Sequence, residues 1–302
     1  MKDIQQLNRT FAIPKQLEIV AGPNGWPMIK IGNHSASALI SLYGAQIVSF
    51  QPHDQVEDLL FLSKKSSYTE GQAIRGGIPV CWPWFGPDPK GLQRANHGFV
   101  RQHFWQLVET TAIDSATTRV RLQFDNTLKQ ESTWRQAFQL SLEITVSQAL
   151  SLKLTTINTG EQAFSITQAF HSYFRVGHIE AVQVLGLEGC EYFDKLEQGA
   201  QKTQHDTVVV TQEVDRIYTG VSTDLMLVDP LLQRRLRIHA PNTSTAVVWN
   251  PWAKTARKMP DLGNNDYRNF ICVEAGNVAF ELIQIQPGNQ HCLQADYQLL
   301  PL

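Results

Sequence analysis

The feature of this sequence that most constrains its fold is a segment in which every second residue is apolar. From Phe138 to Val146, the even positions are apolar and the odd positions are polar. Only an extended chain places alternate side chains on opposite faces, so this segment predicts a strand with one buried and one wet face. A second alternating run begins at Leu150. We expect the two runs to pair as a hairpin, the second ending at the turn 158–160.

Further segments share this period. Residues 120–124 and 235–239 alternate in the same way, 246–249 form a short apolar run, and 278–285 predict a longer strand buried on both faces. The best helical signal is Asn250-Pro251, which favours one short helix directly after a strand. Many short strands favour a sandwich or barrel over alternating strands and helices. We find no internal repeat or linker, so we expect one large antiparallel all-β domain spanning residues 1–302.

Composition and charge exclude several classes of protein. Hydrophobic residues make up 42% of the 302 residues, which is enough for a sizeable core. The formal net charge of −2 shows no basic excess of the kind that nucleic-acid binding requires. No apolar run is long enough to span a membrane, and the first ten residues contain no secretory signal. The absence of long amphipathic helices gives no reason to expect a coiled-coil assembly, and we expect a monomer.

The four cysteines are far apart and form no CxxC pair. This spacing favours reduced thiols in a cytoplasmic enzyme over a zinc or redox site. His97 and His103 lie six residues apart with no cysteine or acidic residue beside them, so they also fail to predict a metal site.

Two loops contain candidate binding residues. The segment 74–89 is rich in glycine and proline, which predicts a rigid irregular loop of the kind that often holds binding residues. Within it, Arg75 either forms a surface salt bridge or binds a phosphate through a bidentate interaction of its guanidinium. In the second loop, His97 is either a hydrogen-bonded loop histidine or a neutral donor to a sugar oxygen.

Three titratable residues elsewhere have two interpretations each. His171 lies between aromatic residues, and it is either a satisfied core histidine or a catalyst. Glu274 follows an apolar strand, so it is either a solvated strand end or a general base whose pKa is raised by the nearby core. Asp215 lies in a polar turn-like context typical of a solvated charge. The sequence contains no phosphate-binding glycine loop, nucleophile elbow or zinc-protease motif.

Taken together, the clusters resemble the aldose 1-epimerase superfamily, and within it the glucose-6-phosphate 1-epimerase branch. The matching stretches follow the family's order from about residue 30 to the C-terminus, and the segment before residue 30 is unassigned. They are Arg75–Pro79 with Trp82–Gly86, His97–Arg101, Phe170–Phe174, Asp215–Tyr218, Val248–Trp252 and Cys272–Gly276.

This resemblance implies a galactose-mutarotase-like large antiparallel β-sandwich, with few short helices and a cleft on a concave sheet. It implies an isomerase that acts on a phosphosugar and needs no metal or organic cofactor. In that enzyme His171 is the general acid and Glu274 the general base. The expected substrate-binding residues are Arg75 and Arg101 at the phosphate, His97 and Asp215 at the sugar, Gln72, and Trp249 as an apolar wall.

The expected reaction interconverts the α and β anomers of glucose 6-phosphate and related hexose 6-phosphates. Glu274 accepts the proton of the anomeric hydroxyl while His171 donates a proton to the ring oxygen. The ring opens to an aldehyde, the C1–C2 bond rotates, and the reverse transfers close the ring. Each well-placed acid or base accelerates such a step by about 10²–10⁴-fold.

Other functions remain open at this point. An aldose 1-epimerase for free sugars would need no arginine pair at the C6 end of the sugar. A non-catalytic carbohydrate-binding module would use Trp82, Trp84 and Trp252 as a platform. A lyase or glycosidase would need a second acid opposite Glu274, for which Asp215 is the candidate. The distance between His171 and Glu274 distinguishes an enzyme from a binding module, because a gap too wide for one pyranose ring favours the binding module.

Overall fold

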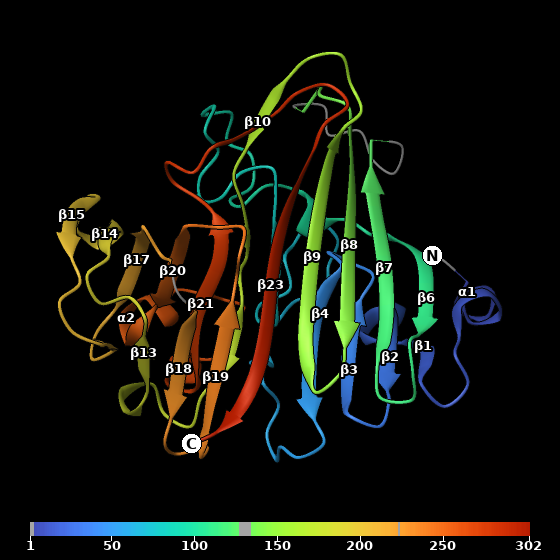
Figure 1. The fold of residues 1–302 in the computed structure, drawn as a ribbon, viewed down its shortest axis with the longest axis horizontal. Coiled ribbons are helices and arrows are strands. Elements are labelled where there is room, and N and C mark those ends of the chain that lie inside the picture. The colour runs from blue at the N-terminus through green and yellow to red at the C-terminus, as the bar shows by residue number, and fades with distance from the viewer. Residues whose placement is uncertain (1–2, 127–133, 223) are drawn as a thin grey trace.

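The structure is a computed structural model that describes residues 3–126, 134–222 and 224–302. Its described elements are mostly antiparallel strands, gathered into three larger sheets and one two-stranded ribbon (Figure 1). This architecture confirms the predicted all-β sandwich with few short helices. The ribbon consists of β10 (Phe164–Ile166) and β22 (Ile283–Ile285).

The largest sheet has nine strands and contains the segments whose alternation is clearest. Phe138 pairs with Asn158 and Val146 with Leu150, so the predicted hairpin is confirmed. The even positions of its first strand are buried, as the pattern predicts. In spatial order the strands are β16 (Val208–Val209), β13 (Gln183–Leu185), β18 (Leu225–Asp229), β19 (Arg234–His239), β23 (Gln290–Pro301), β9 (Ala149–Asn158), β8 (Phe138–Val146), β7 (Thr118–Asp125) and β6 (Gln106–Ala112).

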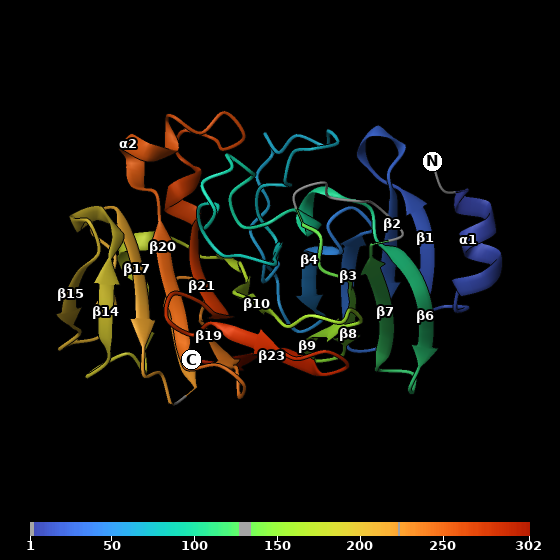
Figure 2. The same cartoon turned by 90° about the horizontal axis from the view of Figure 1, so that it is seen from above.

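Two further sheets pack behind this large sheet, one at each end (Figure 2). The first contains β15 (Ala200–Thr203), β14 (Glu191–Asp194), β17 (Val214–Thr219), β20 (Thr245–Asn250), β21 (Phe270–Asn277), β11 (Gln168–Phe170) and β5 (Val80–Cys81), with β12 (Tyr173–Arg175) also paired to β21. The second contains β1 (Leu17–Ala21), β2 (Pro27–Gly32), β3 (Ala36–Ser41) and β4 (Gln46–Pro52). One buried apolar cluster includes side chains from all three sheets.

The helices are short. Helix α2 (Trp252–Ala256) directly follows β20, as predicted, although it begins one residue later than expected. The side chain of Asn250 accepts a hydrogen bond of 2.9 Å from the Trp252 amide and so fixes the change of direction. Helix α1 (Ile4–Phe11) belongs to the segment that the family resemblance left unassigned. Its Asn8 side chain bonds both backbone groups of Ile19 and ties the helix to β1.

The prediction of a strand over 278–285 is wrong. Strand β21 ends at Asn277, and only Ile283–Ile285 is extended. Ala279 has a φ of 52°, and the amide of Glu281 bonds the carbonyl of Val278 at 3.0 Å, so the chain turns here. Phe280 in this turn is 78% exposed. The apolar run therefore reflects a turn followed by a short ribbon strand, which composition alone does not separate from a long strand.

Within the described parts of the chain, no helix has both the length and the apolar character needed to cross a lipid bilayer. Both α-helices are far shorter than such a span requires.

Candidate active site

A cavity of about 290 Å³ opens on the face of the eight-stranded sheet that is turned away from the nine-stranded sheet. Strand β21 shows how the two faces differ. Its residues Val273 and Ala275 belong to the core shared with the nine-stranded sheet, whereas Cys272 and Glu274 point to the opposite face. The cavity is lined by Arg75, Phe85, Asn96, His97, Arg101, His171, Lys195, Asp215, Val247, Trp249 and Glu274.

His171 reaches this cavity from a break between two strands. Phe170 of β11 pairs with Ala275, and Tyr173 of β12 pairs with Cys272, so the intervening residues lie against the middle of β21. The amide of His171 also bonds the carbonyl of Pro79 at 3.0 Å. As a result, Nδ1 of His171 lies 3.3 Å from Oε1 of Glu274. The predicted acid and base thus meet at one cavity, with no gap as wide as a pyranose ring between them.

Aromatic rings set the orientation of the imidazole. The ring of Tyr173 is stacked on it, with centroids 4.8 Å apart and planes 9° apart. Trp249 meets it edge-on at 5.9 Å. Tyr173 therefore lies on the same face as His171, and Trp249 lines the cavity. Both contacts restrict rotation of the imidazole ring.

His171 and Glu274 are deeply buried, and within the described part of the chain each has a polar atom without a hydrogen-bond partner. His171 is 7% exposed and Glu274 is 1% exposed. Among the described residues, neither Nδ1 of His171 nor Oε2 of Glu274 has a hydrogen-bond partner. Burial lowers the pKa of His171 well below its ordinary value, and the charges of Arg101 and Arg75 add to this effect.

Burial also raises the pKa of Glu274 well above its ordinary value, and the negative charge of Asp215 acts in the same direction. Groups in such contact titrate as a pair. With one group favouring its neutral base form and the other its neutral acid form, the pair holds one proton between them over a broad pH range. The same proton count also describes an imidazolium beside a carboxylate.

The two arginines differ in their partners. Nε of Arg75 donates to Oδ2 of Asp261 at 3.0 Å, and its Nη1 donates to the hydroxyl of Tyr173 at 2.9 Å. Arg75 is therefore both salt-bridged and part of the cavity wall. Arg101 donates from Nη2 to the carbonyl of Asn96 at 2.9 Å, and its Nε has no partner. Among the described residues, no carboxylate lies within ion-pair distance of Arg101, so its positive charge is not neutralised.

His97 presents a defined tautomer to the cavity. Its backbone φ is 64°, and its amide bonds the carbonyl of Gly86 at 2.7 Å. The Gly86 amide in turn donates to Nδ1 of His97 at 3.3 Å. A ring nitrogen that accepts a hydrogen bond carries no proton, so the proton of the neutral imidazole is on Nε2. Burial, with the charge of Arg101, lowers the pKa of His97 and keeps the ring neutral. This geometry supports the neutral-donor interpretation.

Asp215 is not a freely solvated charge. It lies on β17 beside Trp249 of β20, and its Oδ2 is 3.1 Å from Nζ of Lys195. Burial raises the pKa of Asp215, while Lys195 lowers it. Lys195 itself begins a 3-10 helix, Lys195–Glu197, which the side chain of Asp194 caps. Sequence reasoning did not name Lys195, Asn96, Phe85 or Val247 as cavity residues, although Phe85 lies within the loop 74–89.

Gln72 does not join this set. Its side chain is exposed, its amide bonds the carbonyl of Thr69, and it is not among the residues that line the cavity. His103 is also elsewhere, stacked on Phe124. Trp82 and Trp84 are buried in the core, so they form no open sugar-binding platform of the kind that a non-catalytic module would use.

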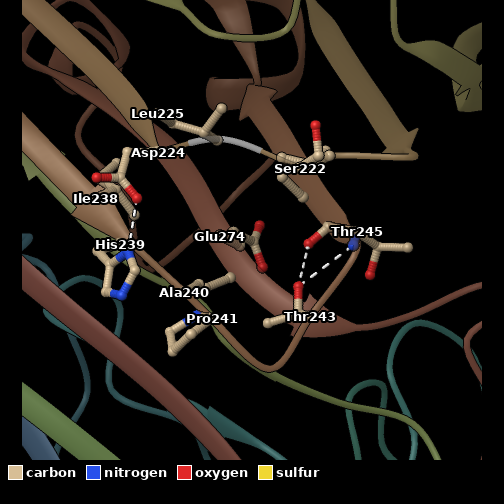
Figure 3. A pocket seen from close by; sticks show the side chains of 13 residues that line it. Ser222, Asp224, Leu225, Ile238, His239, Ala240, Pro241, Thr243, Thr245 and Glu274 are labelled. Atoms are coloured by element: carbon tan, nitrogen blue, oxygen red, sulfur yellow. Dashed lines mark hydrogen bonds and ion pairs between the residues drawn. The ribbon is translucent and has the colours of Figure 1, made fainter.

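A second cavity of about 230 Å³ lies on the other side of β21 (Figure 3). Ala246 and Ala275 line it, and both belong to the core between the sheets. Glu274 lines both cavities. At its mouth, Nδ1 of His239 lies 2.6 Å from Asp224. Strand β21 therefore separates the two cavities at Glu274.

Comparison with known proteins adds three findings. Residues 27–298 match the family model described as aldose 1-epimerase. The chain is 34% identical over 283 residues to a protein of Cenchrus ciliaris provisionally named glucose-6-phosphate 1-epimerase, which covers 90% of this chain and 84% of that one. An Escherichia coli protein with the same provisional name is 32% identical over 82% of each chain.

Solved structures show the same architecture. A Salmonella typhimurium protein, provisionally described as a mutarotase, superposes with a TM-score of 0.87 at 25% identity, over 99% of this chain and 100% of that one. A galactose mutarotase-like protein of Clostridium acetobutylicum superposes with a TM-score of 0.75 at 15% identity, over 95% and 99% of the two chains. The second match concerns the fold alone.

Proposed function

Because the chain belongs to the aldose 1-epimerase family, we propose that it interconverts the α and β anomers of a hexose 6-phosphate by opening and reclosing the sugar ring. The observation that carries this proposal is the 3.3 Å contact between His171 and Glu274 on a cavity that also contains uncompensated positive charge. The names of the relatives support the phosphorylated substrate.

The short separation of the pair suits this reaction. The anomeric oxygen and the ring oxygen are both bonded to C1, so the base and the acid must act on two atoms that are close neighbours. Glu274 takes the proton from the anomeric hydroxyl, and a C1=O double bond forms. The C1–O5 bond breaks, and O5 takes a proton from His171. Rotation about C1–C2 and the reverse transfers then give the other anomer.

Proton balance supports the use of a coupled pair. One proton enters the pair from the anomeric hydroxyl, and one leaves it to the ring oxygen, so the pair holds the same number of protons before and after ring opening. A phosphate dianion beside Arg101 and Arg75 offsets the repulsion that these cations exert on a protonated His171. Substrate binding therefore favours the imidazolium that the donor role requires.

The cations of the cavity supply a phosphate site. Arg101 is the main candidate, because its charge has no carboxylate partner among the described residues and its Nε has no acceptor. Arg75 adds positive charge to the cavity wall, although its guanidinium is also paired with Asp261. Anchoring the phosphate holds the far end of the sugar while C1 rotates, which is remote binding used to position the reacting centre.

Two polar groups remain for the sugar hydroxyls. The Nε2 proton of His97 faces no described acceptor, so a hydroxyl or ring oxygen is its natural partner. Asp215, held by Lys195, is an acceptor on the opposite wall. The four cysteines form no disulfide, which supports the further proposal that the enzyme works in the reducing cytoplasm.

Exchange NMR tests this function directly. The exchange rate between α- and β-glucose 6-phosphate is measured with and without the protein, and again with free glucose. We expect rapid exchange of the phosphosugar and much slower exchange of glucose at equal concentration. Equal acceleration of both would instead indicate an epimerase for free sugars, and no acceleration of either would refute the catalytic function.

A further inference from the structure

We propose that His171, Cys272 and Glu274 form a binding site for a thiophilic divalent cation such as Zn²⁺, and that an ion bound there blocks the active site. One ligand atom from each residue lies within 4.8 Å of the other two. Zinc binds sulfur at about 2.3 Å and imidazole nitrogen at about 2.0–2.1 Å. A small inward shift of the side chains therefore brings all three atoms to coordination distance.

Rigid elements hold the three ligands. Cys272 and Glu274 are two residues apart on β21, so their side chains leave the strand on the same face. His171 lies between β11 and β12, which both pair with β21. All three are buried, and the Cys272 side chain has no exposed surface. Such a cluster loses little side-chain entropy when an ion binds.

Two of the ligand groups lack partners in the structure. Nδ1 of His171 and Oε2 of Glu274 are more than nine-tenths buried and accept or donate no hydrogen bond. A buried polar atom without a partner is unfavourable, and coordination would satisfy it. The cavity in front of the pair leaves room for a water molecule as the fourth ligand, the arrangement typical of open zinc sites.

Charge balance favours a divalent ion in spite of the nearby arginines. When the ion binds, the thiol of Cys272 and the carboxyl of the pair each release a proton to solvent, and the imidazole coordinates in its neutral form. A doubly charged ion then faces one thiolate and one carboxylate, so the cluster remains neutral overall. The sulfur and nitrogen ligands favour Zn²⁺, Cd²⁺ or Co²⁺ over Mg²⁺ and Ca²⁺, which prefer oxygen.

A cobalt titration tests the site without using activity. Reduced, metal-free protein is titrated with Co²⁺, and the thiolate-to-cobalt charge-transfer absorption is recorded. We expect one equivalent of ion to produce this absorption and Zn²⁺ to remove it. Cys272→Ser should abolish it, whereas Cys292→Ser, which changes a half-exposed thiol on the nine-stranded sheet, should retain it.

Two results would refute the proposed metal site. Absence of the absorption in the unaltered protein excludes the thiolate ligand, and its persistence in Cys272→Ser places the ion elsewhere. If Cys272→Ser fails to fold, His171→Asn decides instead. It keeps the thiol and removes the imidazole, so we expect at least tenfold weaker Zn²⁺ binding in competition with a chromophoric chelator. Unchanged affinity would mean adventitious surface binding only.

The inhibitory consequence rests on the proposed function, and it is measured separately. We expect Zn²⁺ to stop anomer exchange, with protection by the phosphosugar and recovery after chelation. If the protein binds cobalt as described but shows no exchange activity, the metal site stands and the proposed function fails. If it is active and binds no cobalt, the metal site fails alone.

Discussion

Nδ1 of His171 lies 3.3 Å from Oε1 of Glu274, although about a hundred positions separate them in the chain. The two groups are buried together on β11–β12 and β21 with incomplete hydrogen bonding. Such an arrangement weakens folding, because burial disfavours the charged form of each group. The proposed transfer of protons to and from a bound sugar gives this unfavourable arrangement a function.

Glu274→Gln tests the base. Glutamine preserves the size of the side chain but cannot take a proton, so we expect anomer exchange to fall by about 10²–10⁴-fold. Exchange NMR with glucose 6-phosphate measures the loss. Glu143→Gln, on the outer face of β8, is the matched control and should keep full activity. Substantial exchange in Glu274→Gln would remove Glu274 from the mechanism.

The same variant also predicts a change in stability with pH. The folded pKa of Glu274 is raised, so between its ordinary pKa and that folded pKa the folded chain binds more protons than the unfolded chain. The contribution of Glu274 to stability is therefore present at low pH and lost as pH rises through this window, at about 1.4 kcal/mol per pH unit for a whole proton. Glu274→Gln should lack that loss. If the free energy of unfolding changed with pH in the same way in both proteins, this prediction would be wrong.

Arg101→Ala separates phosphate binding from sugar binding. Hydrogen bonds to charged groups contribute about 1.5–3 kcal/mol, so we expect KM for the hexose 6-phosphate to rise at least about tenfold. The rate with free glucose should change little. Steady-state kinetics on both substrates measure the difference, and an equal effect on both would exclude Arg101 from the phosphate site.

Arg75→Ala should behave differently from Arg101→Ala. It removes the partner of both Asp261 and the Tyr173 hydroxyl, so we expect it to lower the melting temperature as well as phosphate affinity. Thermal unfolding of the two variants, measured side by side, checks this difference. If Arg101→Ala were the less stable protein, the assignment of a structural salt bridge to Arg75 would be wrong.

Lys195 and Asp215 should shift the alkaline limb of the pH–rate profile in opposite directions. The pair is productive with one proton, so activity falls below the lowered pKa of His171 and above the raised pKa of Glu274. The charge of Lys195 lowers the pKa of Glu274, and that of Asp215 raises it. Lys195→Met should therefore move the alkaline limb to higher pH, and Asp215→Asn to lower pH.

Profiles with free glucose are the sharper measurement, because that substrate has no phosphate ionisation of its own. Lys202→Met is the matched control, since Lys202 lies on the adjacent hairpin and pairs with Glu197. Its profile should coincide with that of the unaltered protein. Shifts of the same sign in Lys195→Met and Asp215→Asn would show that charge at these positions does not act on Glu274.

The sequence predicted β7, β8, β9 and β19 as strands, because one face of each is buried and the other is wet. Several other strands, including the alternating β23, were not predicted. The alternation in β7, β8, β9 and β19 reports that difference between faces directly. The prediction failed at 278–285, where an apolar run contains a turn held by long-range contacts. The Val278 amide bonds the hydroxyl of Thr245, and Asn277 bonds Asn242, on a loop that sequence spacing does not bring near.

Sequence motifs also predicted only part of the candidate site. The motifs marked His171, Glu274, His97, Arg75 and Arg101, and all five line one cavity. Lys195 was missed, because a lysine that begins a single turn after β14 has no distinctive neighbours in sequence. Gln72 was expected among the substrate-binding residues, but its side chain is exposed and does not line the cavity.

By itself, the sequence determined the strands whose alternation is clearest, which face of each is buried, and which residues can exchange protons, since these follow from local pattern and side-chain chemistry. Only the tertiary structure decided that His171 and Glu274 touch and that Lys195 faces Asp215. It also decided that Asp261 pairs with Arg75, while Arg101 has no carboxylate partner within the described part of the chain. The physical reason is that pairing between distant strands sets these distances, and burial sets the proton affinities. Neither these distances nor these proton affinities can be derived from any single segment of the sequence.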